Sequence, residues 1–301
     1  WIVPDGVSYL TINAAGAQGG STKVGTRTYN GGGGATVIGE FPVAPGSKII
    51  MLIGGMGSGT LDQAGGGGGT FVFIEDNSSS YVMPGGTRIR PLVVAGGGGG
   101  AYLNQATGVS SGNAAESGNN TKVGSSTLYG GIGGSGGQGA DAGGGGGFLG
   151  DGGGSGSTGG KSVLYSLGVG GTSTLSSLSG GFGGGGAGYP GVGSGGGGGW
   201  SGGAAGRGQR GGGGGSFNAS PIEESIVIEP GNNSGNFGNG SVLISYYVAV
   251  LPIKLGSFSA HIKQSDVMLR WNTVVEINTS YFEIQKSTDG RNFTTIGQVA
   301  A

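Results

Sequence analysis

Unbroken glycine runs recur along the middle of the chain and restrict what it can fold into. Ordering a glycine costs about 1–2 kcal/mol of backbone entropy or somewhat more, and glycine has no side chain whose burial could offset that loss. Such runs are therefore either disordered or held by backbone hydrogen bonds alone. The longest runs cover residues 31–34, 65–69, 96–100, 143–147, 183–186, 195–199 and 211–215.

One ordered arrangement open to these runs is the polyproline-II helix, with about three residues per turn and a rise of about 3.1 Å per residue. Its N–H and C=O groups point outward, so helices lying side by side can bond to one another at ~1 kcal/mol net per bond. Only glycine permits the close approach. The sequence therefore predicts a bundle of polyglycine-II helices in which the runs lie as neighbouring rods.

The alternative is a disordered low-complexity tract. Composition alone would favour it, since the 301 residues include 83 glycines and 9 prolines. However, a flexible Gly/Ser linker has no use for large apolar side chains, and aromatic residues flank the runs. The ordered bundle, with aromatic residues as its caps and edges, is therefore the favoured interpretation. The flanking aromatics include Phe148, Phe182, Tyr189, Trp200 and Phe217.

Outside the glycine runs the sequence is typical of β-strands. Short segments rich in β-branched and aromatic residues are bounded by Gly, Pro, Asp or Asn, and helical apolar spacing is absent. Because strands occur on both sides of the glycine runs, we expect the first and last strands to share one β-sandwich into which the bundle is inserted. The expected strands are residues 7–14, 35–43, 47–53, 70–75, 91–95, 222–228 and 241–248.

The composition changes at residues 249–252, which predicts one domain at 1–249 and a second at 250–301. Glycine is rare in the second segment, and Asp289-Gly290 lies at the centre of a hairpin turn. We expect strands there at residues 254–262, 267–272, 281–286 and 292–299.

The second domain is expected to be an incomplete sandwich. Trp271, Phe258 and Phe282 are its candidate core residues, but a complete sandwich needs roughly seven strands. A few strands alone are only marginally stable in water. We therefore expect the segment to dock on the first domain through Val250 and Leu251.

Composition also limits the function classes. The formal net charge is −1 and 10% of residues are charged, which excludes the electrostatic footprint of nucleic-acid binding. The chain has no cysteine, so it has neither a disulfide scaffold nor a thiolate zinc site. No apolar stretch approaches the ~20 residues of a membrane span. Because the chain starts at Trp1 without a signal segment, we expect a mature or trimmed fragment.

The motifs that could carry chemistry are weak. Residues 154–162 contain a glycine pattern of the nucleotide-binding kind, but it does not lie between a buried strand and a helix. Residues 136–141 resemble one calcium-binding nonapeptide, which functions in tandem copies, so a structural turn is the better interpretation. His261 is the only histidine, and the adjacent Glu223 and Glu224 point to opposite faces of a strand. The sequence predicts no enzyme, no cofactor and no metal.

Nearly all of the first domain resembles a known family, and the resemblance is carried by residues 3–7, 14–20, 94–100, 143–152, 180–186 and 238–244. These segments closely resemble the glycine-rich domain of the anaplastic lymphoma kinase and leukocyte tyrosine kinase receptors and its bacterial relatives. The resemblance implies a tumour-necrosis-factor-like, or jelly-roll, β-sandwich carrying an inserted polyglycine-II helix bundle. Cytokine binding is not carried over, because the receptor version has cysteines. A looser architectural resemblance is to phage tail-fibre adhesins.

Residues 251–260, 271–273 and 276–290 look like the fibronectin-III-like, Ig-like module that precedes the C-terminal sorting domain in type IX secretion substrates of Bacteroidota. The resemblance implies export through the type IX translocon to the outer surface of a Gram-negative bacterium or into the medium. It also implies a sorting domain beyond Ala301.

The segment 200–210 is the candidate binding site. Trp200, Arg207 and Arg210 combine an aromatic face with planar cations, a pairing suited to sugars or carboxylates. The alternative is that Trp200 caps the bundle and the arginines are solubilising. The predicted function is an adhesin or rigid structural module on the cell surface. A released ligand- or glycan-binding module is the competing class, and an enzyme ranks third.

Overall fold

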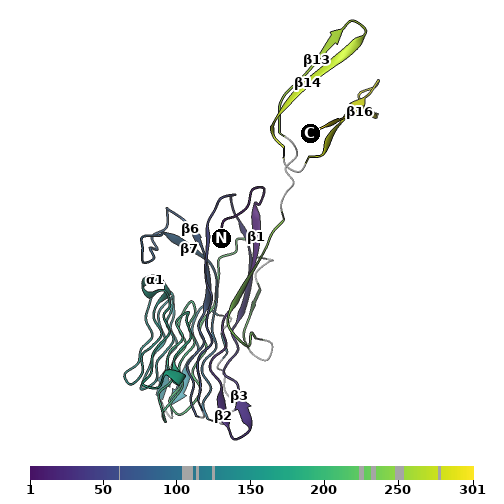
Figure 1. Cartoon of the computed structure of the whole chain (residues 1–301). Coiled ribbons are helices and arrows are strands. Elements are labelled where there is room, and N and C mark those ends of the chain that lie inside the picture. Colours follow the sequence, from purple (N-terminus) through teal and green to yellow (C-terminus); the bar gives the residue numbers. More distant parts are fainter. Residues whose placement is uncertain are drawn as a thin grey trace. The chain divides into compact units, whose positions relative to one another are not determined.

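The computed structural model describes residues 1–60, 62–103, 111–112, 115–123, 126–223, 227–231, 235–247, 254–276 and 279–301. It divides into two compact units (Figure 1). The first comprises Trp1–Pro4 and Tyr9–Tyr247, and the second Asp5–Ser8 and Val248–Ala301. Val250 and Leu251, the expected docking residues, lie outside the described residues.

Regular structure in the described residues is nearly all β-strand, which confirms the all-β fold class. Helical elements among the described residues include α1 (Val163–Ser166) and the 3-10 turn η1 (Ser176–Leu178). The strands are β1 (Tyr9–Ala15), β2 (Thr22–Val24), β3 (Arg27–Tyr29), β4 (Thr36–Pro42), β5 (Ile49–Leu52), β6 (Thr70–Glu75), β7 (Ile89–Ala95), β8 (Thr121–Val123), β9 (Ser126–Leu128), β10 (Phe217–Asn218), β11 (Val227–Glu229), β12 (Ser241–Ser245), β13 (Lys254–Lys263), β14 (Asp266–Val275), β15 (Tyr281–Lys286) and β16 (Thr294–Ala300).

Two four-stranded antiparallel sheets make up the β-sandwich of the first unit. Their strand orders are β11-β4-β1-β12 and β10-β7-β6-β5, and β1 and β4 contact β7 of the other sheet. The expectation that the first and last strands share one sandwich is confirmed, because β1 pairs with β12, with Ile12 opposite Ile244. The inward side chains Leu10, Ile12 and Phe41 are almost fully buried, as alternation along a half-buried strand requires.

Strand β6 is buried on both faces. Phe71 and Phe73 point to one side of the sheet and Val72 to the other, and none of the three is measurably exposed. Phe73 lies against Phe148, with the ring centroids 5.9 Å apart. One side of this sheet therefore faces its partner sheet, and the opposite side is covered by residues from the glycine-rich region.

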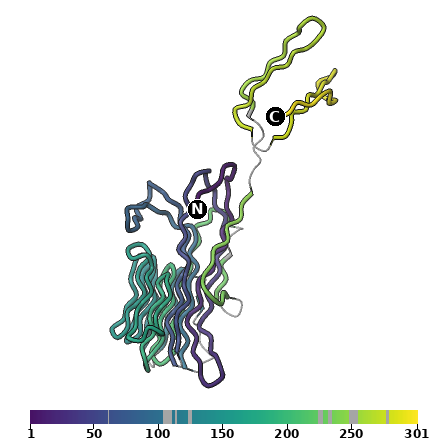
Figure 2. Tube along the Cα trace, in the orientation of Figure 1, coloured from purple at the N-terminus to yellow at the C-terminus, as the bar shows by residue number. Residues whose placement is uncertain are grey.

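Many sandwich strands run directly into glycine-rich segments, which lie side by side in Figures 1 and 2. For example, β7 ends at Ala95 and residues 96–100 follow it, while β10 begins at Phe217 after residues 211–215. We call the hydrogen-bonded set of these segments the glycine lattice. Its main members are residues 16–20, 31–35, 64–69, 96–100, 143–147, 183–187, 195–199, 202–206 and 211–215.

The backbone bonds of residues 195–199 repeat every three residues and reach more than two neighbouring segments. A β-strand, by contrast, bonds only to a partner on either side within one sheet. Gly195 and Gly198 donate their N–H groups to the carbonyls of Ala64 and Gly67, respectively. Gly196 and Gly199 donate theirs to Gly143 and Gly146, and Gly197 donates to Gly212. The carbonyls of Gly195 to Gly198 accept from Gly100, Gly186, Gly203 and Gly97 in turn.

The expected inserted bundle of polyglycine-II helices is not supported by the secondary structure of the described residues. In the described part of the chain, the runs at 65–69, 96–100, 143–147 and 195–199 are assigned neither helix nor strand. Their hydrogen bonds go to other segments rather than along the same segment, so no α-helix or 3-10 helix forms there. The runs nevertheless lie as bonded neighbours rather than as isolated surface loops.

The lattice leaves no room for side chains at its centre. A Cβ placed on Gly145 would lie well inside 3.0 Å of the carbonyl oxygen of Gly197. A Cβ placed on Gly197 would likewise lie well inside 3.0 Å of the carbonyl oxygen of Gly97. Real Cβ atoms essentially never approach so closely. Because the obstructing atoms are backbone, no rotamer change could relieve the clash.

The second unit is built from the hairpins β13–β14 and β15–β16. The rings of Trp271 and Phe282 meet edge to face, with centroids 5.7 Å apart. None of its described residues from 255 to 301 is buried, and Phe258 is 63% exposed. Of the side chains expected to form a core, Phe258 is therefore exposed, and Trp271 and Phe282 are only half-buried.

Candidate functional site

Trp200, the first of the predicted binding residues, lies in an aromatic stack. Its ring is parallel to Phe217 at 4.2 Å and to Phe148 at 5.1 Å between centroids. The residue is 9% exposed and belongs to the apolar cluster that covers β6 and β7. Both faces of the indole are therefore occupied by protein, and the ring has no open face to offer a ligand.

The indole nitrogen of Trp200 is buried without a hydrogen-bond partner. Its backbone N–H, by contrast, donates to the carbonyl of Gly215 at 2.8 Å. Position 200 follows directly on the run 195–199, so the side chain covers one end of that run. This placement fits the alternative in which Trp200 is a cap.

Arg207 and Arg210 lie at the other end of the same run. The N–H of Gly206 donates to Ser194, which directly precedes the run, and the N–H of Gly208 donates to Val192. A five-residue rod is about 15 Å long. The structure therefore does not bring Trp200 together with the two arginines, and it offers no joint aromatic and cationic surface at segment 200–210.

The two arginines have different surroundings. Arg207 Nε lies 3.7 Å from a carboxylate oxygen of Asp141, and both side chains are largely exposed. Such a pair contributes little to stability. Arg210 is partly buried, and the loss of solvent lowers the pKa of its guanidinium below the usual value. Arg207 and Arg210 are thus close in sequence, but only Arg207 offers a well-hydrated cation.

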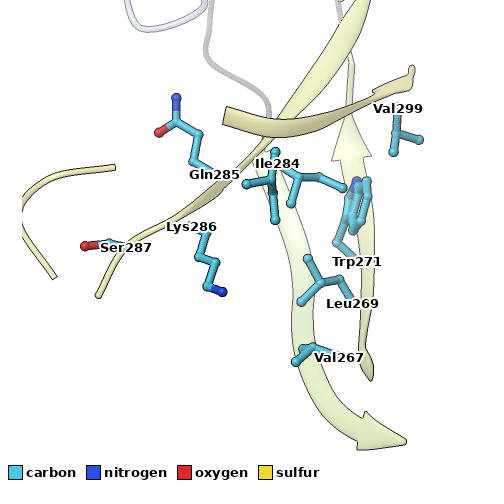
Figure 3. Close-up of a pocket in the computed structure, with 9 residues that line it drawn as sticks. Val267, Leu269, Trp271, Ile284, Gln285, Lys286, Ser287 and Val299 are labelled. Carbon is cyan, nitrogen blue, oxygen red and sulfur yellow. The ribbon is translucent and has the colours of Figure 1, made fainter. Parts of the chain in front are cut away.

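Two adjoining hollows lie between the hairpins of the second unit, with volumes of about 740 and 240 Å³. Figure 3 shows Leu269, Ile284 and Trp271 turned toward one another in the larger hollow. The lining is mainly apolar and carries no pair of groups suited to acid–base chemistry. We interpret the hollows as the unfilled interior of the expected sandwich.

A third hollow, of about 500 Å³, lies at the surface of the first unit beside β8 and β9, and we call it the Tyr129 groove. No periodic or motif signal in the sequence marks this groove, because its residues come from the segments that flank the β8–β9 hairpin and from the turn that follows. The only available signal was the presence of an aromatic residue and side-chain amides between the runs. Its lining residues are Ser117, Gly118, Asn120, Tyr129, Gly130, Gly131, Ile132, Ser135, Gly136 and Gln138.

The weak motifs of the sequence are structural elements here. The carbonyl of Asp141 accepts the N–H groups of Gly156 and Ser157, so residues 136–141 end in a backbone-bonded turn. Asp151 accepts from Lys161 Nζ at 2.9 Å and from the N–H of Ser162 at 2.7 Å, just before α1. The carboxylate thus satisfies a donor at the start of that short helix.

Within the described ranges, no group of three or more His, Cys, Asp or Glu side chains is arranged to hold a metal ion. No helix there is both long enough and apolar enough to cross a membrane. No protein-family model matches the chain, and no curated protein matches it. The function is therefore argued from the geometry of the chain itself.

Proposed function

We propose that the protein is a non-enzymatic surface component of a Gram-negative bacterium, exported by type IX secretion and acting as an adhesin or a rigid presentation module. The glycine lattice carries this proposal. Its threefold hydrogen-bond repeat along 195–199 matches the repeat of a polyproline-II helix, so we interpret its segments as polyglycine-II helices. The export route is supported by the resemblance of residues 251–260, 271–273 and 276–290 to a module of secreted proteins.

A lattice of this kind suits a rigid support. Each inner segment is bonded in several directions, so no single segment can leave without breaking bonds to several neighbours. Local unfolding is expected where backbone bonds are few and exposed, and the run 195–199 is entirely buried. A stiff body that continues directly into the sandwich strands can hold surface loops in fixed positions.

A released ligand- or glycan-binding module is the competing proposal. The Tyr129 groove would give such a module its binding site, because the groove combines an exposed aromatic ring with side-chain amides on a backbone-bonded base. The two proposals differ in where the protein acts, on the cell that makes it or after release. A binding groove serves either of them.

The test is deletion of the gene, followed by complementation with the wild-type gene or with a Gly145→Ala variant. A Gly208→Asn variant is the matched control, because Gly208 has open space around its Cβ position and a φ of +64°, which Asn tolerates. Antibody labelling of intact cells reports export, and attachment to a surface reports adhesion. We expect the deletion to lose attachment and the wild-type and Gly208→Asn genes to restore both signals.

The outcomes separate the parts of the proposal. Labelling that needs cell lysis in every complemented strain would overturn the export proposal. Labelling of the spent medium alone would favour the released module. Attachment that survives deletion of the gene would overturn the adhesin proposal. Full attachment by the Gly145→Ala strain would show that an intact lattice is not needed for the function.

A further inference from the structure

The base of the Tyr129 groove is fixed to the glycine lattice. The N–H of Gly131 donates to Gly202 at 2.7 Å, and the N–H of Gly202 donates to Ser135 at 3.0 Å. The N–H of Gly118 also donates to Gly131 at 2.9 Å. These bonds hold the turns on both sides of the groove against an inner lattice segment, so the groove has a preformed shape.

Two side-chain amides of the groove are held by the backbone. Asn120 Oδ1 accepts the N–H of Gly130 at 2.8 Å, and Gln138 Oε1 accepts the N–H of Tyr129 at 3.0 Å. Because a backbone N–H needs an acceptor, these contacts fix the oxygen of each amide on the protein side. The NH₂ group of each amide is left as a donor, and both side chains are exposed. The groove thus presents oriented donors at its surface.

An exposed aromatic ring lies beside these donors. Tyr129 is 57% exposed and Ile132 is 73% exposed, so an apolar surface and hydrogen-bonding groups occur together. None of the described residues that line the groove carries a charge. A phosphate, sulfate or carboxylate ligand would therefore find no counter-charge there, and a neutral ligand is favoured.

We propose that the Tyr129 groove binds a neutral saccharide unit of a glycan chain. The C–H face of a sugar ring would pack on the tyrosine ring, and its hydroxyl groups would accept from the amides of Asn120 and Gln138. A volume of about 500 Å³ lies within the range of small-ligand sites, roughly 300–1,000 Å³. The binding of a neutral saccharide is argued from the geometry of the groove alone. Only the biological role of this binding rests on the proposal that the protein is a surface module.

The test uses the purified full chain on an array of neutral, sulfated and sialylated oligosaccharides, followed by calorimetric titration of the strongest ligand. The variant is Tyr129→Ala, which removes the ring and leaves the backbone N–H that anchors Gln138. The matched control is Tyr165→Ala, since Tyr165 is 64% exposed and lies on α1, outside the groove. Urea unfolding of each variant checks that the fold is retained.

We expect at least one neutral oligosaccharide to bind, with the affinity reduced tenfold or more by Tyr129→Ala and changed less than twofold by Tyr165→Ala. An array without any bound neutral oligosaccharide would overturn the proposal. Equal losses in the two variants, or a preference for sulfated or sialylated glycans, would do the same. A blank array together with normal cell attachment would reject the groove and leave the adhesin proposal standing.

Discussion

The glycine lattice and the second unit solve the problem of burial in opposite ways. The lattice has almost no side chains, yet runs such as 195–199 are completely buried. The second unit is rich in large apolar side chains, yet Phe258, Ile262 and Val267 are each more than 60% exposed. Apolar content alone therefore does not decide which part of this chain has an interior.

The difference lies in what each part needs from its neighbours. The lattice satisfies its backbone groups within the first unit, so its segments can close on one another without side-chain burial. The hairpins of the second unit satisfy their backbone groups by pairing, but the hollows between them leave Trp271 and Phe282 only half-buried. In a sandwich, the inner faces of both sheets are needed to form the core.

The sharpest way to break this comparison is to add one methyl group to the lattice. Gly145→Ala places a Cβ against the backbone carbonyl of Gly197. The N–H of the same residue donates to Gly203, so a shift of the backbone would also disturb that bond. Overpacking typically costs about 1–3 kcal/mol, and values above ~4 are exceptional. We expect about 3–5 kcal/mol here because the clash is with fixed backbone. Urea unfolding followed by circular dichroism measures it.

The control for this substitution is Gly208→Asn, where the Cβ meets nothing within 4 Å. We expect it to change the free energy of unfolding by less than about 0.5 kcal/mol. A Gly145→Ala protein as stable as this control would show that the lattice can move apart at little cost. The contrast between backbone-held and side-chain-held regions would then fail.

Much of the sandwich could be predicted from the sequence because side-chain patterns specify it. The expected strand at residues 70–75 coincides with β6, and the one at 281–286 coincides with β15. The short hairpins β2–β3 and β8–β9 were missed, since strands of three residues carry little alternation. The partners of each lattice segment could not be predicted, because glycines offer no side-chain difference by which one run would select another.

The candidate site was predicted less well than the fold. Trp200 and Arg207 are close in sequence, but the segment 202–206 between them runs alongside 195–199 toward Ser194, which places them at opposite ends of that run. Residue spacing converts into distance only when the path of the backbone is known. The Tyr129 groove was missed for the same reason, since Asn120, Tyr129 and Gln138 meet through turns that the sequence does not mark.

The second unit supplies a smaller effect that sharpens the comparison. Phe258→Ser removes an exposed side chain, so we expect the free energy of unfolding to change by no more than ~1 kcal/mol. Binding of the dye ANS should fall, because the open apolar surface becomes smaller. Phe73→Ser, at a fully buried position, should cost about 3–5 kcal/mol. Similar losses in both variants would mean that Phe258 is covered in solution.

The smallest expected effect tests whether side-chain contacts matter to the lattice. Partial burial raises the pKa of Asp151, but hydrogen bonds from Lys161 Nζ and from the N–H of Ser162 outweigh it and hold the pKa below the usual 3.8. A carboxyl group with a lowered folded-state pKa stabilises the fold above its unfolded pKa. That contribution is lost as the pH falls through the folded pKa. Wild type and Asp151→Asn should therefore differ at pH 7 and converge in acid.

Because this pair is largely exposed, we expect a difference of about 0.2–1 kcal/mol at pH 7, measured by urea unfolding between pH 7 and pH 2. Asp62→Asn is the control, an exposed position with no ion pair among the described residues, and it should show no such pH dependence. Asp151 anchors the start of α1, whose Val163 and Leu164 pack into the apolar cluster around Phe148. If Asp151→Asn cost as much as Gly145→Ala, side-chain contacts would hold the lattice as firmly as its backbone bonds do. If the backbone holds the lattice, Asp151→Asn should lower the free energy of unfolding only slightly, and only at pH values above the folded-state pKa of Asp151.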